Sequence, residues 1–185
     1  MEQLVSVLAA LLAAPWLGSF QAAPAPEFSN AVCHVAFARP AGWDVEKIES
    51  ANGQERCWFE AAPAKPQQFP GIPDDVDLHT ITIVVSDEGL EEALPRSLFE
   101  REGVLWFALG RLGARTAAQP ISNAGWAGAR GTKIIECFRK GGGSAGPCEV
   151  PTAFIGTAER SAELEGGPAS GPAFDSVLQS LRFIP

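Results

Sequence analysis

The four cysteines are the residues whose number and spacing point most directly to chemistry. An even number in a chain that also carries an export signal, described below, favours disulfides over free thiols or metal ligands. Cys137 and Cys148 flank a turn-rich run, so a bridge across a β-hairpin is geometrically natural. Cys33 and Cys57 then pair by elimination. Zinc is the competing interpretation, but the chain has no C-x-x-C spacing.

Ser144 lies in a G-x-S-x-G match, the pattern that places the nucleophile of many hydrolases. The motif requires a strand before the serine, a helix after it and a histidine further along the chain. Both histidines, His34 and His79, lie upstream, and no helical pattern follows residues 142–146. We therefore expect Ser144 to lie in a turn and no residue to be catalytic. A hydrolase built on Ser144 is the alternative.

A group of acidic residues is the remaining candidate for binding a metal ion. Asp74, Asp75 and Asp77 lie close in sequence to Asp87 and Glu88. Carboxylate oxygens are the ligands that Ca²⁺ prefers, so a weak calcium site is one interpretation. A solvated acidic loop is the other, and it is the one we adopt. The sequence thus predicts neither a metal nor another cofactor.

The net charge narrows the classes of partner. The chain has 14 basic and 22 acidic residues, which gives a formal net charge of −8. Nucleic acids and anionic membrane surfaces repel such a chain, so neither is expected as a partner.

Residues 1–23, MEQLVSVLAALLAAPWLGSFQAA, have the pattern of a signal peptide. The apolar run over 4–14 fits an export signal and is too short to span a bilayer. This stretch contains no lysine or arginine, which leaves a buried N-terminal helix of the mature fold as the alternative. We expect a single domain over 24–185, no membrane span after processing, and a periplasmic or secreted location.

Alternating and β-branched segments predict strands, and two segments with helical spacing predict helices. The helices are expected over 95–112 and 172–182. Gly103 lies inside the first, so a helix followed by a separate strand over 104–109 is the alternative there. The strands are expected over 31–38, 43–49, 56–61, 79–86, 117–122, 127–138 and 149–158.

Three apolar residues are candidates for contact with a partner. Phe69 and Ile72 lie in the loop over 62–77, whose four prolines favour an extended conformation. They would either meet another molecule or dock on the domain itself. Trp126 follows a turn, which makes it a candidate for a binding face, although packing under the adjacent hairpin is the favoured interpretation.

Two segments resemble those of the Mog1/PsbP-like α/β superfamily, which includes DcrB-like bacterial envelope proteins. Residues 37–45, FARPAGWDV, are similar to its F-x-x-P-x-G-W-x-V opening hairpin, and residues 174–183, FDSVLQSLRF, to its terminal helix. The resemblance implies an α+β fold with a central, mainly antiparallel β-sheet flanked by an internal helix and a C-terminal helix. The four cysteines and the long loop depart from the family pattern.

The resemblance also implies a mostly non-catalytic role, because members include photosystem II accessory subunits, binders of a small GTPase and effector chaperones. We expect a monomeric, exported accessory or binding protein that acts on a protein partner in the bacterial envelope or outside the cell. A hydrolase and a carrier of a small apolar ligand are the alternatives. A solid core with an exposed apolar patch would favour the partner binder, and a closed apolar cavity would favour the carrier.

Overall fold

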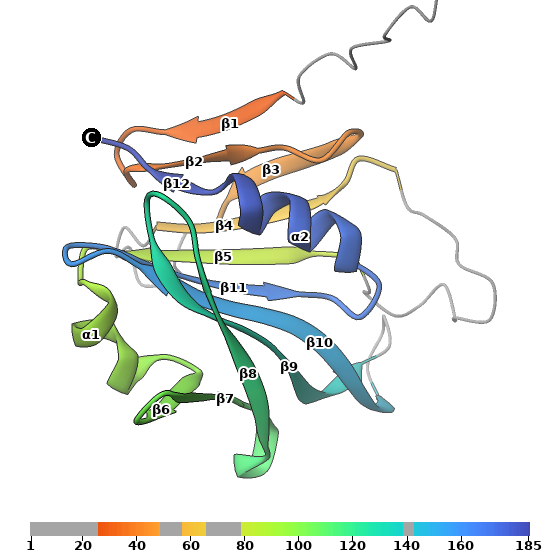
Figure 1. Ribbon diagram of the computed structural model, residues 1–185. Coiled ribbons are helices and arrows are strands. Elements are labelled where there is room, and N and C mark those ends of the chain that lie inside the picture. Colours follow the sequence, from red (N-terminus) through yellow and green to blue (C-terminus); the bar gives the residue numbers. More distant parts are fainter. Residues whose placement is uncertain (1–25, 49–56, 66–78, 139–142) are drawn as a thin grey trace, which may run out of the picture.

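Two antiparallel sheets form the protein (Figure 1). The computed structural model describes residues 26–48, 57–65, 79–138 and 143–185. Within these ranges, a nine-stranded sheet has the order β3-β4-β5-β11-β10-β9-β8-β7-β6, and a three-stranded sheet has the order β1-β2-β12.

The strands of the large sheet are β3 (Trp43–Lys47), β4 (Cys57–Pro63), β5 (Ile81–Ser86), β6 (Phe99–Glu102), β7 (Leu105–Leu109), β8 (Arg115–Ser122), β9 (Ala127–Phe138), β10 (Ser144–Gly156) and β11 (Ser161–Gly166). Those of the small sheet are β1 (Glu27–Asn30), β2 (Val35–Ala38) and β12 (Arg182–Phe183). The helices are α1 (Leu90–Ala93) and α2 (Gly171–Ser180), and the 3₁₀ turns are η1 (Leu94–Arg96) and η2 (Arg111–Gly113).

The main core lies between one face of the large sheet, the small sheet and α2. Successive residues of a strand point to opposite faces, so Ala153 and Ile155 of β10 enter this core while Phe154 does not. Helix α2 adds Phe174, Val177 and Leu178 from its buried side. In Figure 1, α2 lies across the strands beside the small sheet.

A second, smaller core lies on the opposite face. Phe154 of β10 packs there against Phe99 of β6, with 6.1 Å between their ring centroids. A Cβ at Gly131 in β9 would lie only 3.0 Å from the Cβ of Ala118 in β8, so glycine permits this close approach. Residues of β6, β7 and α1 cover part of this second face. The buried residues of this core are Ala93, Phe99, Trp106, Ala108, Ala129 and Phe154.

The helix predicted over 95–112 is wrong. Of the alternative, a helix followed by a strand over 104–109, the strand is confirmed as β7, whereas β6 occupies part of the segment before it. Gly103 has φ +62°, the left-handed conformation that closes the tight turn between β6 and β7. The apolar side chains at helical spacing belong instead to two strands, where Phe99 and Trp106 face the same core.

The expected α+β fold, a central sheet flanked by an internal and a C-terminal helix, is therefore also wrong. Strands dominate the described residues, and the internal helix is reduced to the four residues of α1. The C-terminal helix is confirmed as α2, and the strands expected over 43–49, 79–86, 117–122 and 127–138 are found with small shifts. The sequence prediction missed β1, β6 and β11, because these strands are short and rich in charged or small residues.

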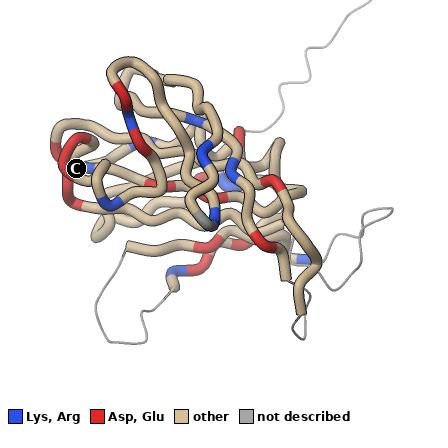
Figure 2. The backbone as a smooth tube through the Cα atoms, turned by 90° about the horizontal axis from the view of Figure 1, so that it is seen from below, with Lys and Arg blue, Asp and Glu red and all other residues tan. Residues whose placement is uncertain are grey.

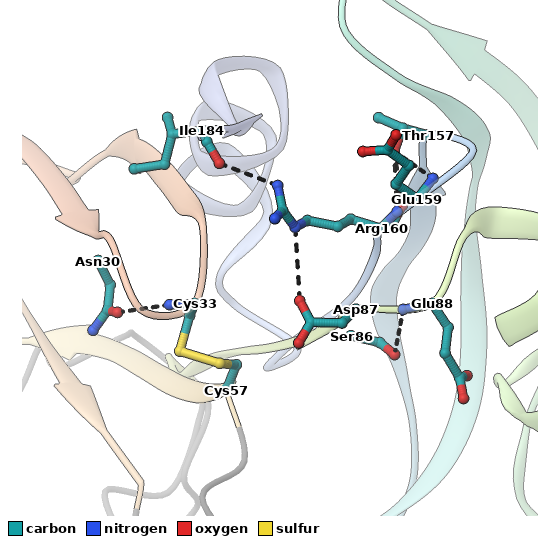
Figure 3. A network of polar contacts seen from close by, with 10 residues as sticks. All are labelled: Asn30, Cys33, Cys57, Ser86, Asp87, Glu88, Thr157, Glu159, Arg160 and Ile184. Atoms are coloured by element: carbon teal, nitrogen blue, oxygen red, sulfur yellow. Dashed lines mark hydrogen bonds and ion pairs between the residues drawn. A yellow bond between two sulfur atoms is a disulfide. The ribbon is translucent and has the colours of Figure 1, made fainter.

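Both predicted disulfides are confirmed. Cys33, in the turn before β2, is bonded to Cys57 of β4, with 5.4 Å between their Cα atoms, so this bridge joins the small sheet to the large one (Figure 3). The backbone N–H of Cys33 also donates to Oδ1 of Asn30 at 3.0 Å. Cys137 and Cys148 join β9 to β10, with a Cα–Cα distance of 5.9 Å. Among the helices in the described ranges, none is long and apolar enough to cross a membrane.

Candidate binding pocket

A pocket of about 680 Å³ lies on the second face of the large sheet, beside α1 and η1. Its apolar walls include Val84 of β5, Ala93 of α1 and Phe154 of β10. Serine hydroxyls and carboxyl groups make up much of the remaining wall, among them Glu163 of β11. The pocket is thus lined by apolar and acidic groups together.

Strand register places Glu163 between apolar neighbours. It pairs with Val84 of β5 on one side and with Phe154 of β10 on the other, and Val84 pairs in turn with Trp58 of β4. Residues paired across neighbouring strands point to the same face of the sheet. The carboxyl group of Glu163 therefore rises from a row that is otherwise apolar.

Glu163 is an ionisable group whose pKa is shifted by its surroundings. Its Oε1 is buried and has no hydrogen-bond partner among the described residues. Burial raises the pKa of this carboxyl group, while the positive charge of Lys133 and a hydrogen bond from the backbone of Leu98 oppose that rise. Glu163 therefore holds its proton to a higher pH than an ordinary glutamic acid.

Lys133 of β9 is buried, with 4% of its side chain exposed, and its charge is compensated by Glu165. Its Nζ lies 2.5 Å from Oε2 of Glu165, whose side chain is 36% exposed. Glu165 follows Glu163 by two residues in β11, so both carboxyl groups project from the same face. Lys133 thus forms an ion pair with Glu165. It acts on Glu163 only electrostatically, without a close contact.

The rim of the pocket carries further acidic groups. Arg96 of η1 forms an ion pair with Glu88, so its charge is already compensated. Asp87 is 86% exposed and lies 3.6 Å from Nε of Arg160, as Figure 3 shows. Elsewhere, lysines and arginines are interspersed with acidic residues along the chain (Figure 2). The pocket is locally acidic because Asp87, Glu88 and Glu163 all line it.

Ser144 lies at the start of β10 and is followed by a strand. Its hydroxyl donates to the carboxylate of Glu136 and accepts the backbone N–H of Gly146 at 2.9 Å. His34 lies in the turn before β2 with φ 52°, and its Nδ1 is buried without a hydrogen-bond partner in the described ranges. His79 precedes β5. The expectation that Ser144 lies in a turn is therefore wrong, because Ser144 is the first residue of β10 and pairs with Phe138 of β9.

Trp126 does not lie on an exposed face. It is 8% exposed, packs in the main core, and donates its indole N–H to the carbonyl oxygen of Leu181 at 2.8 Å. Trp126 is therefore packed in the interior, as the favoured interpretation of the sequence predicted. The other sequence-based candidates fall outside the described residues: the signal segment 1–23, Phe69, Ile72, and the acidic residues Asp74, Asp75 and Asp77.

The exposed apolar residues lie elsewhere, and sequence reasoning missed them. Val104 is 85% exposed and Leu105 is 59% exposed at the turn between β6 and β7, and Phe138 is 54% exposed at the end of β9. The helix predicted over 95–112 placed Leu105 on a buried stripe. The strand alternative would have exposed it, since it alternates with the buried Trp106.

Fold and site together define a disulfide-linked antiparallel β-sheet protein with an acidic pocket. No known family model matches the sequence, and no curated protein matches it. A solved structure from Bacteroides thetaiotaomicron VPI-5482 resembles it with a TM-score of 0.52 at 11% sequence identity, over 88% of this chain and 50% of that one. The chain thus spans about half of that protein's length, and at this identity the likeness concerns the fold alone.

Proposed function

We propose that this protein is an exported, non-catalytic binding protein that docks on a protein partner through the turn between β6 and β7. The observation that carries the proposal is the exposure of Val104 and Leu105 at this turn, 85% and 59%. Adjacent apolar side chains that project into solvent gain free energy when a partner covers them.

The two strands that flank the turn are anchored on both faces of the hairpin, which supports a role in recognition. Phe99 and Trp106 anchor its two strands in the second core. On the other side, Arg115 contacts the carboxylates of Glu100 and Glu102, at 3.1 and 2.7 Å. A preformed surface loses little conformational entropy on binding. Strand β6 is also an edge of the large sheet, where a partner strand can add.

The disulfides support an oxidising location, periplasmic or secreted, because such bonds persist mainly outside the cytosol. The two cores are packed with side chains, and the large pocket beside Glu163 is lined partly by charged groups. Those features favour a partner binder over a carrier that encloses an apolar ligand.

The test is quantitative affinity capture from the native envelope fraction with a double variant, Val104→Ser with Leu105→Thr. The amount of partner that the double variant captures should be about tenfold or more below the amount captured by the unaltered protein. The melting temperature of the variant should stay unchanged. Val32→Ser is the matched control, because Val32 is 71% exposed in the turn between β1 and β2. Equal capture by the double variant and the unaltered protein would overturn the proposal.

A further inference from the structure

Glu163 presents an acceptor that the described part of the protein leaves unsatisfied. Its Oε1 is buried without a hydrogen-bond partner there, and the residue lines the pocket beside α1 and η1. A buried acceptor without a partner costs free energy that a bound donor recovers. This is the chemical feature of the pocket that calls for a ligand.

The nearby cations are already engaged. Lys133 lies 2.5 Å from Glu165, and Arg96 is paired with Glu88. The positive charge of Lys133 acts on Glu163 without a close contact between the two side chains. A ligand that carries its own positive charge would supply the missing hydrogen bond to Glu163 without breaking either ion pair.

The walls define the rest of the ligand. Asp87, Glu88 and Glu163 outnumber Arg96 among the charged lining residues, which suits a cation better than an anion. The described residues contain no group of three side chains that could hold a metal ion. Val84 and Phe154 offer apolar surface, and about 680 Å³ is enough for a small organic molecule. An ammonium group has three N–H donors, which suits a carboxyl oxygen beside serine hydroxyls.

We propose that this pocket is a binding site for a small organic cation, a primary ammonium group on an apolar body, which donates to the carboxyl group of Glu163 once the side chain turns its buried Oε1 toward the pocket. The apolar body lies against Val84 and Phe154. The site is separate from the turn between β6 and β7, so this inference goes beyond the proposed function.

Calorimetric titration with three probes of similar size tests the charge requirement. Phenethylammonium should bind with saturation at millimolar concentrations, whereas 2-phenylethanol should bind about tenfold more weakly and phenylacetate should not bind. Absence of saturable binding of phenethylammonium overturns the proposal. Equal binding of the alcohol, or binding of phenylacetate, overturns it as well.

Two substitutions that each remove one negative charge test where the probe binds. Glu163→Gln should weaken phenethylammonium binding about tenfold or more, because an amide keeps the shape and removes the charge. Glu159→Gln removes an exposed carboxylate from the turn between β10 and β11 and should leave binding unchanged. Equal binding by Glu163→Gln and the unaltered protein contradicts the assignment.

A second pair of variants decides the question if Glu163→Gln does not fold. Val84 is 39% exposed and pairs directly with Glu163, so Val84→Lys supplies an ammonium group within the chain. This variant should no longer bind the probe, while Val84→Met, similar in length and uncharged, should still bind it. Undiminished binding by Val84→Lys would overturn the proposal.

Both sites can be tested in the same proteins. Glu163→Gln should keep partner capture, and the variant at Val104 and Leu105 should keep phenethylammonium binding. Failure of one proposal is therefore distinguishable from failure of the other.

Discussion

The indole N–H of Trp126 donates to the carbonyl oxygen of Leu181 at 2.8 Å, across 55 positions of the sequence. Trp126 is 8% exposed and Leu181 is 1% exposed, so the bond is shielded from water. It fastens the turn between β8 and β9 to the residue that follows α2. The end of the helix and the long β9–β10 hairpin are therefore linked through a side chain.

Trp126→Phe should destabilise the protein by about 1–3 kcal/mol, because it keeps an aromatic ring but leaves the carbonyl of Leu181 without its donor. Chemical denaturation measures this loss. Trp58→Phe is the matched control, since Nε1 of Trp58 is buried without a hydrogen-bond partner among the described residues. It should cost clearly less. Equal losses from the two substitutions would contradict the importance of the hydrogen bond.

Local sequence patterns predicted the long strands and α2 but failed where distant contacts decide. Leu105 and Trp106 fit a helical stripe, yet Gly103 at φ +62° makes a turn, and Trp106 completes a core with Phe154 of β10. No local pattern shows that this distant partner is available. The buried position of Trp126 also depends on a distant contact, because its acceptor, the carbonyl oxygen of Leu181, lies 55 positions further along the chain.

Breaking the ion pair between Lys133 and Glu165 should have unequal effects from its two sides. Lys133 is 4% exposed in its side chain and Glu165 is 36% exposed. Glu165→Gln leaves a buried ammonium group without its close partner and should cost about 3 kcal/mol, whereas Lys133→Met leaves a carboxylate that water can reach and should cost less. Urea denaturation of both variants at neutral pH measures the difference. A larger loss from Lys133→Met would show that burial does not set the cost.

The stability contribution of Glu163 should fall as the pH rises. Burial raises its pKa in the folded state, so the native protein keeps a proton that the unfolded chain releases near the ordinary glutamate value of about 4.3. Above that value, each further rise in pH favours unfolding until the native carboxyl group has also ionised. Glu163→Gln lacks this effect, so its stability relative to the unaltered protein should increase with pH and then level off.

Glu91→Gln is the control, because the pH dependence of its effect on stability should have the opposite sign. A hydrogen bond from Arg101 lowers the pKa of Glu91, so its small contribution is present at neutral pH and is lost in acid. Denaturation of the three proteins at a series of pH values tests both signs. A constant difference between Glu163→Gln and the unaltered protein would contradict the burial of this carboxyl group.

The sequence prediction missed both the pocket and its strand β11. The alternation in residues 161–166, SAELEG, is compatible with a strand whose carboxylates share one face. No sequence pattern indicates that Lys133, Phe154 and η1 cover that face. Charged residues at alternate positions of a strand ordinarily face solvent. The cysteine pairs were predictable because their number and spacing leave few geometrically reasonable pairings.

The two disulfides should contribute unequally to stability. Cys33–Cys57 closes the longer separation, 24 positions against 11, and it joins the two sheets through a residue that is 1% exposed. Cys137–Cys148 reinforces β9 and β10, which an extended ladder of backbone pairs already joins. Replacing the first pair by alanine should cost about 4 kcal/mol, and replacing the second about 3 kcal/mol. Thermal unfolding of both double variants, with fully reduced protein as the reference, measures the difference. Equal melting temperatures would show that loop entropy and the link between the sheets do not determine how much each disulfide stabilises the protein.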